Sequence, residues 1–226
     1  LSRVPSLPAG ELTDEVRRIR QTHTDPGDQL VAALRFVQQN IRYLSVAIGE
    51  GSYTPSPPAL VMQRRFGDCK DKTLLLLTML QALGIEAQAA LVNTETRKGV
   101  KDRVPSAGAF NHVLVRARVG QQWVWIDPTK DPQVGTLASI SQPNFGLALI
   151  IAPQTQALEP MPLEDASYSV RKVHTTYDAT EGIGKTATLT VTTELQGLSA
   201  ERMRSDLARS NLEELGRRYL KFYGGY

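Results

Sequence analysis

The sequence contains only one cysteine and three histidines in 226 residues. A single cysteine excludes an internal disulfide, and it leaves the redox compartment of the protein undecided. These four residues lie far apart in the sequence and lack the paired spacing of zinc ligands, so a structural zinc site is not expected. We predict that the protein uses neither a metal nor another cofactor.

Long apolar runs are also absent from the sequence. No run approaches the ~20 apolar residues that a membrane-spanning helix needs, so we expect no direct membrane insertion of this segment. No signal peptide begins at Leu1, and Leu1 is not an initiator methionine. We therefore interpret the start as a processing or cloning boundary, which leaves the location of the parent protein open.

The sequence has no large excess of charge of one sign, because 26 basic residues face 23 acidic residues and the formal net charge is +3. The basic cluster at Arg17, Arg18 and Arg20 shares its segment with acidic residues at 11, 14 and 15. This mixture favours a solvated helix face, and we expect no nucleic-acid partner. With 41% hydrophobic residues, the chain can bury the core of one large domain, or of one domain plus a piece.

The single cysteine lies where a helix is predicted to begin. Gly67 ends the preceding structure, the polar stretch 68–73 suits a first helical turn, and the leucine-rich segment 74–83 runs to a stop at Gly84. The free N–H groups and the dipole of a helix N-terminus stabilise negative charge, so this position favours a reactive thiolate at Cys69. The alternative is a cysteine that only packs, because free cysteine is among the most buried residue types.

The first part of the chain predicts helices followed by an antiparallel sheet. Apolar residues recur at helical spacing in two early segments, and short apolar runs separated by turns follow the cysteine helix. This order is typical of an α+β domain. Two long loops interrupt it, and the first, rich in Gly, Ser and Pro, is either a cleft wall or an exposed connector. We expect helices at 12–19 and 30–41, strands at 43–48, 85–92, 111–119, 123–126 and 147–151, and loops at 49–58 and 94–108, the latter flexible.

From about residue 156 the composition changes. The segments 167–177 and 185–193 are rich in Thr, Val and Tyr and predict a β-hairpin, after which a helix begins at Ser199. One hairpin and one helix are too little for an independent core. We therefore predict two domains, a core domain at 1–155 and the start of a larger β-rich domain at 156–226.

A histidine and an aspartate are predicted to face each other across a hairpin. His112 begins one strand, Asp127 ends the next, and a turn near Gly120 joins the two. Residues whose numbers sum to about 240 lie opposite each other, so His112 and Asp127 fall on neighbouring strands within contact distance. Nucleophilic thiol catalysis needs such a base and a group that orients it. The structural alternatives are a strand-end histidine bonded to backbone and an aspartate that only forms a turn before Pro128.

Three motifs of the chain resemble the transglutaminase-like superfamily, in which Cys, His and Asp occur in this order with comparable gaps. Upstream, Asn40-Ile41-Arg42-Tyr43 and the Pro-rich loop resemble the bacterial branch in which this core follows a large β-rich N-terminal domain. The resemblance spans residues 11–151, and the Thr-rich hairpin with the helix start at 197–200 resembles the C-terminal domain of that branch. The three motifs are Gly67-Asp68-Cys69-Lys70-Asp71-Lys72, Phe110-Asn111-His112-Val113 and Trp125-Ile126-Asp127-Pro128-Thr129.

The resemblance implies a papain-like fold, in which a cysteine helix packs on an antiparallel sheet that carries the histidine and the aspartate. It makes Cys69 the nucleophile, His112 the base and later acid, and Asp127 the residue that orients the imidazole. The oxyanion would meet the Cys69 N–H and a donor from the upstream loop. Tyr53 is the candidate donor and Tyr43 the second candidate, with packing as the alternative role of both. Calcium dependence is not implied, because the acidic clusters of the animal relatives are absent.

The implied activity is cysteine-dependent acyl transfer on peptide or protein amides. The same triad performs proteolysis, deamidation and cross-linking, and the acceptor depends on the shape of the pocket. Because the bacterial relatives resemble hydrolases more often, we expect a protease or amidase. The alternatives are a cross-linking transamidase and a non-catalytic module that binds a peptide or envelope partner. The resemblance also implies a periplasmic or envelope location, with the flanking β-rich domains of the parent protein as partners.

Overall fold

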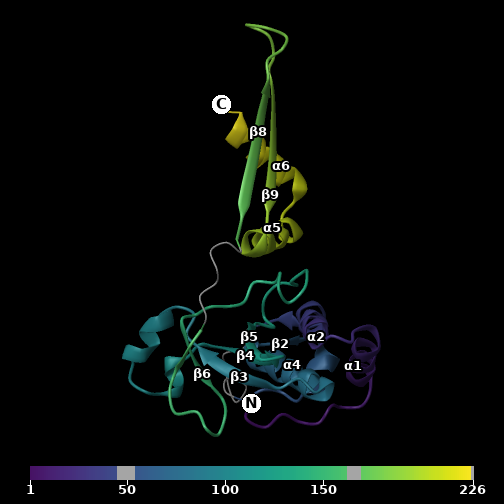
Figure 1. Cartoon of the computed structure of the whole chain (residues 1–226), viewed down its shortest axis with the longest axis vertical. Helices are drawn as coiled ribbons and strands as arrows, with labels where there is room; N and C mark the ends of the chain where they lie inside the picture. Colours follow the sequence, from purple (N-terminus) through teal and green to yellow (C-terminus); the bar gives the residue numbers. More distant parts are fainter. Residues whose placement is uncertain (45–53, 162–168, 225–226) are drawn as a thin grey trace. The chain divides into compact units, whose positions relative to one another are not determined.

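The structure, a computed structural model, describes residues 1–44, 54–161 and 169–224. It divides into two compact units, Leu1–Glu164 and Asp165–Tyr226 (Figure 1). The first unit extends past the predicted boundary at residue 155, because β7 (Glu159–Pro160) pairs with β6 (Leu147–Ile150) in its sheet. That the two units are separate domains of the parent protein stays a prediction.

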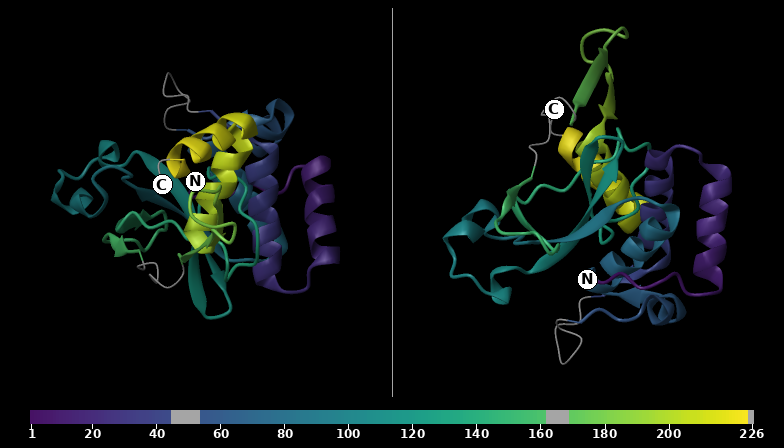
Figure 2. Two further views of the ribbon diagram at one scale, coloured as in Figure 1. Left: turned by 90° about the horizontal axis from the view of Figure 1, so that it is seen from above. Right: turned by 60° about the horizontal axis from the view of Figure 1, so that its bottom comes forward.

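The helices of the first unit surround the helix that begins with the cysteine. α1 packs beside α2 (Figure 2), and α4 packs against α1, α2 and α3. The first two helices confirm the helices predicted at 12–19 and 30–41, whereas α3 has no counterpart among the predictions because seven residues are too few to show a helical period. The helices are α1 (Glu11–Thr22), α2 (Pro26–Asn40), α3 (Pro58–Arg64) and α4 (Cys69–Leu83).

The cysteine helix α4 begins and ends where the sequence predicts. The side chain of Asp68 caps its first turn, and Gly84 ends it in the left-handed conformation with φ of 81°. Its consecutive leucines are buried whichever way they point, so α4 is covered on all sides rather than on one stripe. Leu75, Leu76 and Leu80 each have a side chain that is 0% exposed.

The sheet of the first unit is antiparallel, with the strand order β5-β4-β3-β6-β7. It confirms the hairpin predicted around Gly120 and the α+β class. A second, two-stranded element pairs β1 in parallel with β2, directly before the cysteine helix. Most of the strand predicted at 43–48 lies outside the described residues. The further strands are β1 (Arg42–Tyr43), β2 (Phe66–Gly67), β3 (Ala87–Val92), β4 (His112–Val119) and β5 (Gln122–Ile126).

Both faces of the sheet are covered. The larger core lies between α4 and one face of β3 and β4, where Val113 and Val115 point toward the helices. A smaller cluster on the other face includes Leu114, Trp125 and Met161. Because alternate residues of β4 point to opposite faces, the strand that carries His112 is held from both sides.

The segment 94–108 differs from the flexible loop that was predicted. It contains two 3₁₀ helices, η2 (Arg97–Asp102) and η3 (Ala107–Ala109), and buries Val100. The buried side chain of Asn93 explains this order, because its Oδ1 accepts two N–H groups at the start of the segment and its Nδ2 donates to the carbonyl of Ala109 at 2.8 Å. One asparagine therefore closes both ends of the segment.

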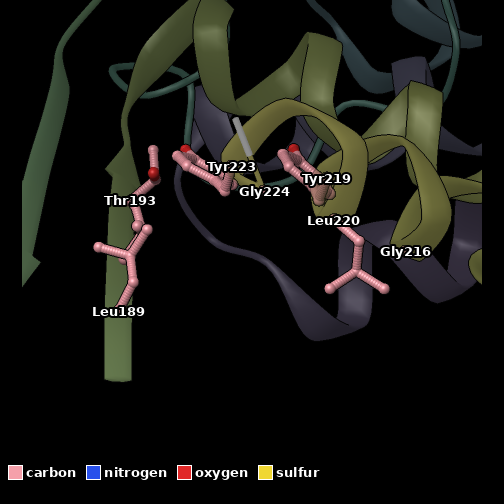
Figure 3. A pocket seen from close by; sticks show the side chains of 8 residues that line it. Leu189, Thr193, Gly216, Tyr219, Leu220, Tyr223 and Gly224 are labelled. Carbon is pink, nitrogen blue, oxygen red and sulfur yellow. The ribbon is translucent and has the colours of Figure 1, made fainter. Parts of the chain in front are cut away.

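The second unit contains the predicted hairpin, β8 (Arg171–Asp178) with β9 (Thr188–Leu195), and two helices in place of one. The helices are α5 (Gly197–Arg209) and α6 (Leu212–Tyr223), and Asn211 separates them because its side chain caps α6 through the N–H of Glu213. Side chains of β9 and α6 line a cavity of about 670 Å³ (Figure 3). All side chains of α6 are exposed or half-buried.

Candidate active site

Cys69 is the first residue of α4, and the side chain of Asp68 caps that helix. Asp68 Oδ1 accepts the N–H of Lys70 at 2.9 Å and the N–H of Asp71 at 3.3 Å. In return, Asp71 Oδ2 accepts the N–H of Asp68 at 3.3 Å. This capping box fixes the first helical turn, and with it the half-buried side chain of Cys69.

The carboxylate of Asp71 ties the cysteine helix to the chain before it. It accepts the N–H of Ser56 at 2.7 Å and pairs with the guanidinium of Arg64. Gly67 permits this arrangement, because a Cβ at that position would lie 2.7 Å from the Cβ of Asp71. The glycine of the Gly-Asp-Cys motif is therefore required by packing, whereas the preceding helix α3 ends at Arg65 in the left-handed conformation.

His112 and Asp127 lie within hydrogen-bond distance, with 2.9 Å between His112 Nε2 and Asp127 Oδ2. The pairing of Val115 with Ile126 in the hairpin places Asp127 one residue past the end of β5, from where its carboxylate reaches the first residue of β4. The structure thus brings together the two residues that the hairpin predicted to be neighbours. Their catalytic roles stay predictions.

The second carboxylate oxygen of Asp127 is bound by Thr129. Asp127 Oδ1 accepts the N–H of Thr129 at 2.9 Å and its hydroxyl at 2.7 Å. Asp127 is 4% exposed, so protein groups rather than solvent satisfy its carboxylate. Thr129 is the last residue of the motif Trp125-Ile126-Asp127-Pro128-Thr129, and the sequence alone predicts no role for it.

Burial and hydrogen bonding act in opposite directions on the two groups. Burial alone would raise the pKa of Asp127, but the hydrogen bond and charge of His112, with the bonds from Thr129, lower it below the usual 3.8. Burial would lower the pKa of His112, whereas its interactions with Asp127 and Cys69 raise it to about 10. The arrangement favours an imidazolium whose Nε2 bonds to Asp127, with Cys69 among the groups that raise its pKa.

An aromatic ring covers the imidazole. Phe145 meets His112 edge to face, with 6.0 Å between the ring centroids and an interplanar angle of 78°. The His112 side chain is accordingly only 10% exposed. Phe145 lies in the loop before β6, where no periodic pattern points to it, so the sequence does not predict this contact.

Lys72 is a buried cation one helical turn after Cys69. It is 1% exposed, and its Nζ donates to the carbonyl of Ile41 at 2.5 Å. Burial lowers the pKa of Lys72 to about 8, although the carboxylates of Asp127 and Asp131 act in the opposite direction. Because lysine is rarely buried, a sequence pattern does not predict that the Lys72 ammonium group lies in the interior.

Of the two tyrosines predicted as oxyanion donors, the structure describes only Tyr43. Tyr53 lies outside the described residues. Tyr43 is in β1, paired in register with Gly67, and is 44% exposed. It borders a cavity of about 450 Å³ that Lys72 and Thr129 also line. The role of either tyrosine as an oxyanion donor stays a prediction.

Among the residues that the structure describes, no group of three or more His, Cys, Asp and Glu side chains is arranged to hold a metal ion. Within the same ranges, no helix has both the length and the apolar character needed to cross a membrane.

Three crystal structures are similar to this chain. A "putative protease" from Parabacteroides distasonis has a TM-score of 0.50 and 13% identity, over 76% of this chain and 34% of that one. A "TGase" has a TM-score of 0.40 and 16% identity, over 52% and 30%. A "putative cysteine protease" from Cytophaga hutchinsonii has a TM-score of 0.36 and 13% identity, over 85% and 54%. The first similarity supports the fold, and the chain spans about a third of that protein's length.

A search of curated proteins gives no match to this chain. The family model of the transglutaminase-like superfamily, whose members are generally thiol-dependent enzymes, matches residues 14–128. This range holds 115 of the 226 residues, and it includes Cys69, His112 and Asp127. The chain belongs to the transglutaminase-like superfamily.

Proposed function

We propose that this chain is a cysteine-dependent acyl-transfer enzyme that hydrolyses amide bonds of peptides or proteins. Cys69 is the nucleophile, His112 the base and acid, and Asp127 the residue that orients the imidazole. The observation that carries the proposal is the 2.9 Å hydrogen bond between His112 Nε2 and the buried Asp127, on an imidazole that also interacts with Cys69. A nucleophile, a base and an orienting group are the parts that covalent catalysis needs.

In the first half-reaction, the Cys69 thiolate attacks the carbonyl carbon of the amide and forms a C–S bond. The carbonyl electron pair moves to oxygen, and the imidazolium of His112 donates its proton to the amide nitrogen. The C–N bond then breaks and the amine leaves. The products on the protein are a thioester at Cys69 and a neutral His112.

In the second half-reaction, His112 takes a proton from water while the water oxygen attacks the thioester carbon. Collapse of this second tetrahedral intermediate breaks the C–S bond and releases the carboxylic acid. The thiolate and the imidazolium are restored. With a primary amine in place of water, the same steps form a new amide, which is the transamidase alternative.

The oxyanion of both intermediates needs donors near Cys69. Asp68 accepts the N–H groups of Lys70 and Asp71, which are the second and third of α4. We assign the first N–H of the helix, that of Cys69, to the oxyanion. The dipole of α4 adds to the stabilisation of negative charge at this end.

The proposal is tested by the alkylation of Cys69 with iodoacetamide across a pH series, beside His112→Ala. An ion-paired nucleophile reacts down to about pH 5, and the variant loses this reactivity. A thiol that stays inert, or whose reaction rises only near ~8.5 in both proteins, contradicts the proposal and favours the binding module.

The acceptor is tested with a glutamine peptide, with and without a primary amine, and mass spectrometry of the products. Hydrolysis gives the acid or a cleaved peptide even when amine is present, and Cys69→Ala gives neither. A dominant amine adduct would contradict hydrolysis and favour the transamidase.

We also propose that the substrates are peptides or proteins of the periplasm or cell envelope, where flanking β-rich domains of the parent protein would contribute to their binding. This rests on the resemblance to the bacterial branch of the superfamily. Fractionation of cells that express the parent protein tests it, because recovery in the cytoplasmic fraction alone would contradict an envelope location.

A further inference from the structure

The side chain of Gln38 makes three hydrogen bonds to the chain segment that begins with Asp127. Its Nε2 donates to the carbonyl of Asp127 and to Oε1 of Gln133, both at 3.1 Å. Its Oε1 accepts the N–H of Gln133 at 2.9 Å. Gln38 lies in the last turns of α2 and is 6% exposed, so a buried amide of one helix is used entirely on this segment.

The segment 127–133 is held at its far end as well. Gln133 is 3% exposed, and its Nε2 donates to the carbonyl of Ser141 at 3.0 Å. Arg35, one helical turn before Gln38, donates its Nε to the carbonyl of Gln133 at 3.0 Å. Helix α2 therefore fixes both ends of a loop that has no regular secondary structure of its own.

These bonds act on the residue that binds His112. Thr129 fixes the carboxylate of Asp127, but Thr129 belongs to the same loop and moves with it. Gln38 fixes the carbonyl of Asp127 to a helix that packs against α4, the helix of Cys69. The amide of Gln38 thus links the segment of the orienting carboxylate directly to a helix that packs against the helix of the nucleophile.

We propose that Gln38 is a positioning residue of the acyl-transfer site, which acts by holding Asp127 at the distance where its carboxylate bonds to His112. The inference rests on the proposed function for its catalytic meaning. Whether Gln38 holds the Asp127 carboxylate at His112 can be measured without any substrate.

The test uses Gln38→Met, which keeps the length and volume of the side chain and removes all three hydrogen bonds. A second variant, Gln38→Leu, removes the same three hydrogen bonds and adds no charge. Gln39→Ala is the matched control, because Gln39 is the next residue of α2 and is exposed. The readout is the imidazole titration of His112 by NMR in the full chain, with the melting temperature of each variant beside it.

If Gln38 positions Asp127, the apparent pKa of His112 falls by at least ~1 unit in both Gln38 variants and is unchanged in Gln39→Ala. The alkylation rate of Cys69 below neutral pH falls with it by about tenfold. If Gln38 only stabilises the fold, the melting temperature falls while the His112 titration stays that of the parent, and this result would overturn the inference. Should Gln38→Met fail to fold, Gln38→Leu decides by the same titration.

The failure of this inference is distinguishable from the failure of the proposed function. An inert Cys69 in the parent protein contradicts the enzyme, yet the His112 titration still reports whether Gln38 holds Asp127. A reactive Cys69 with an unchanged His112 titration in the Gln38 variants contradicts the inference alone.

Discussion

Thr129 donates both its backbone N–H and its hydroxyl to Oδ1 of Asp127, the carboxylate oxygen that does not face His112. The two oxygens of one buried carboxylate thereby have two different partners: one oxygen is fixed within its own loop by Thr129, and the other holds the imidazole. Because hydrogen bonds to a charged acceptor are stronger than neutral ones, Thr129 also keeps Asp127 ionised. The motif Asp-Pro-Thr therefore combines a turn with a charge, and the two interpretations of Asp127 are compatible.

We expect Thr129→Val to lower the free energy of unfolding by about 1–3 kcal/mol, since it removes one hydrogen bond to a buried carboxylate and keeps the backbone N–H. Urea denaturation at pH 7 measures this. Thr180→Val is the matched control, because Thr180 makes the same two bonds to Asp178 on an exposed turn, where solvent can replace the hydroxyl. Equal losses in the two variants would show that the burial of Asp127 has no influence.

The stability of the protein should depend on pH through His112. Its pKa is raised from 6.5 in the unfolded chain to about 10 in the folded chain. A raised pKa contributes stability that is fully present below about 6.5 and is lost as the pH rises through 10. Lys72 affects the stability in the opposite direction. Because its pKa is lowered from 10.5 to about 8 in the folded chain, the free energy of unfolding rises between pH 8 and pH 10.5.

The difference between the parent and His112→Gln isolates the histidine from Lys72. We expect this difference in unfolding free energy to shrink by at least ~1.4 kcal/mol between pH 6 and pH 10, which corresponds to one pKa unit. Urea titrations at four pH values across this range measure it. A difference that does not change with pH would mean that the pKa of His112 is the same in the folded and the unfolded chain.

Local signals of the sequence predict the positions of Cys69, His112 and Asp127. They do not predict the buried residues that hold these three in place. Gly67 and Gly84 delimit the cysteine helix, and a turn at Gly120 is enough to place His112 beside Asp127, because the geometry of a hairpin is fixed by its turn. The helix α6 begins at Leu212, directly after Asn211, a capping residue of the type that marks a helix start in a sequence. These features depend on neighbours within a few residues.

The supports depend on partners that are distant in the sequence. Gln38 is a polar residue on an amphipathic helix, where exposure is the common outcome, and the carbonyl that it binds comes 89 residues later. Lys72 likewise bonds to a distant partner, the carbonyl of Ile41, which comes 31 residues earlier. No periodicity marks such residues, because their burial follows from the packing of the whole unit.

Gly67→Ala tests the close approach of Asp71 to the chain before the cysteine helix. The added Cβ would lie 2.7 Å from the Cβ of Asp71, so the capping box has to shift. We expect a loss of about 1–3 kcal/mol, typical of overpacking, together with slower alkylation of Cys69. Gly108→Ala is the control, since its nearest neighbour beyond the adjacent residues, the hydroxyl of Ser106, is at an ordinary 3.8 Å. An unchanged free energy of unfolding in Gly67→Ala would show that the first turn of α4 can shift to accommodate the added Cβ.

The ion pair between Arg64 and Asp71 is suited to a double-mutant cycle. The side chains are 25% and 7% exposed, and Arg64 also donates to the carbonyl of Phe66 at 2.7 Å, directly before the cysteine motif. We expect Asp71→Asn to cost about 2–4 kcal/mol, because it leaves the guanidinium without its partner carboxylate. The asparagine Oδ1 can still accept the N–H of Ser56. The loss of stability therefore measures mainly the ion pair with Arg64 rather than the hydrogen bond to Ser56.

Arg64→Met leaves the carboxylate of Asp71 with the N–H groups of Ser56 and Asp68, and should therefore cost less than Asp71→Asn. In the double variant neither charge is stranded, so we expect the two losses to be non-additive, with an interaction energy of about 1–3 kcal/mol. Urea denaturation of the four proteins gives this value, and Cys69 alkylation follows the effect on the first turn of α4. Additive losses would mean that the capping box alone holds Cys69 and that Arg64 acts only through its bond to Phe66.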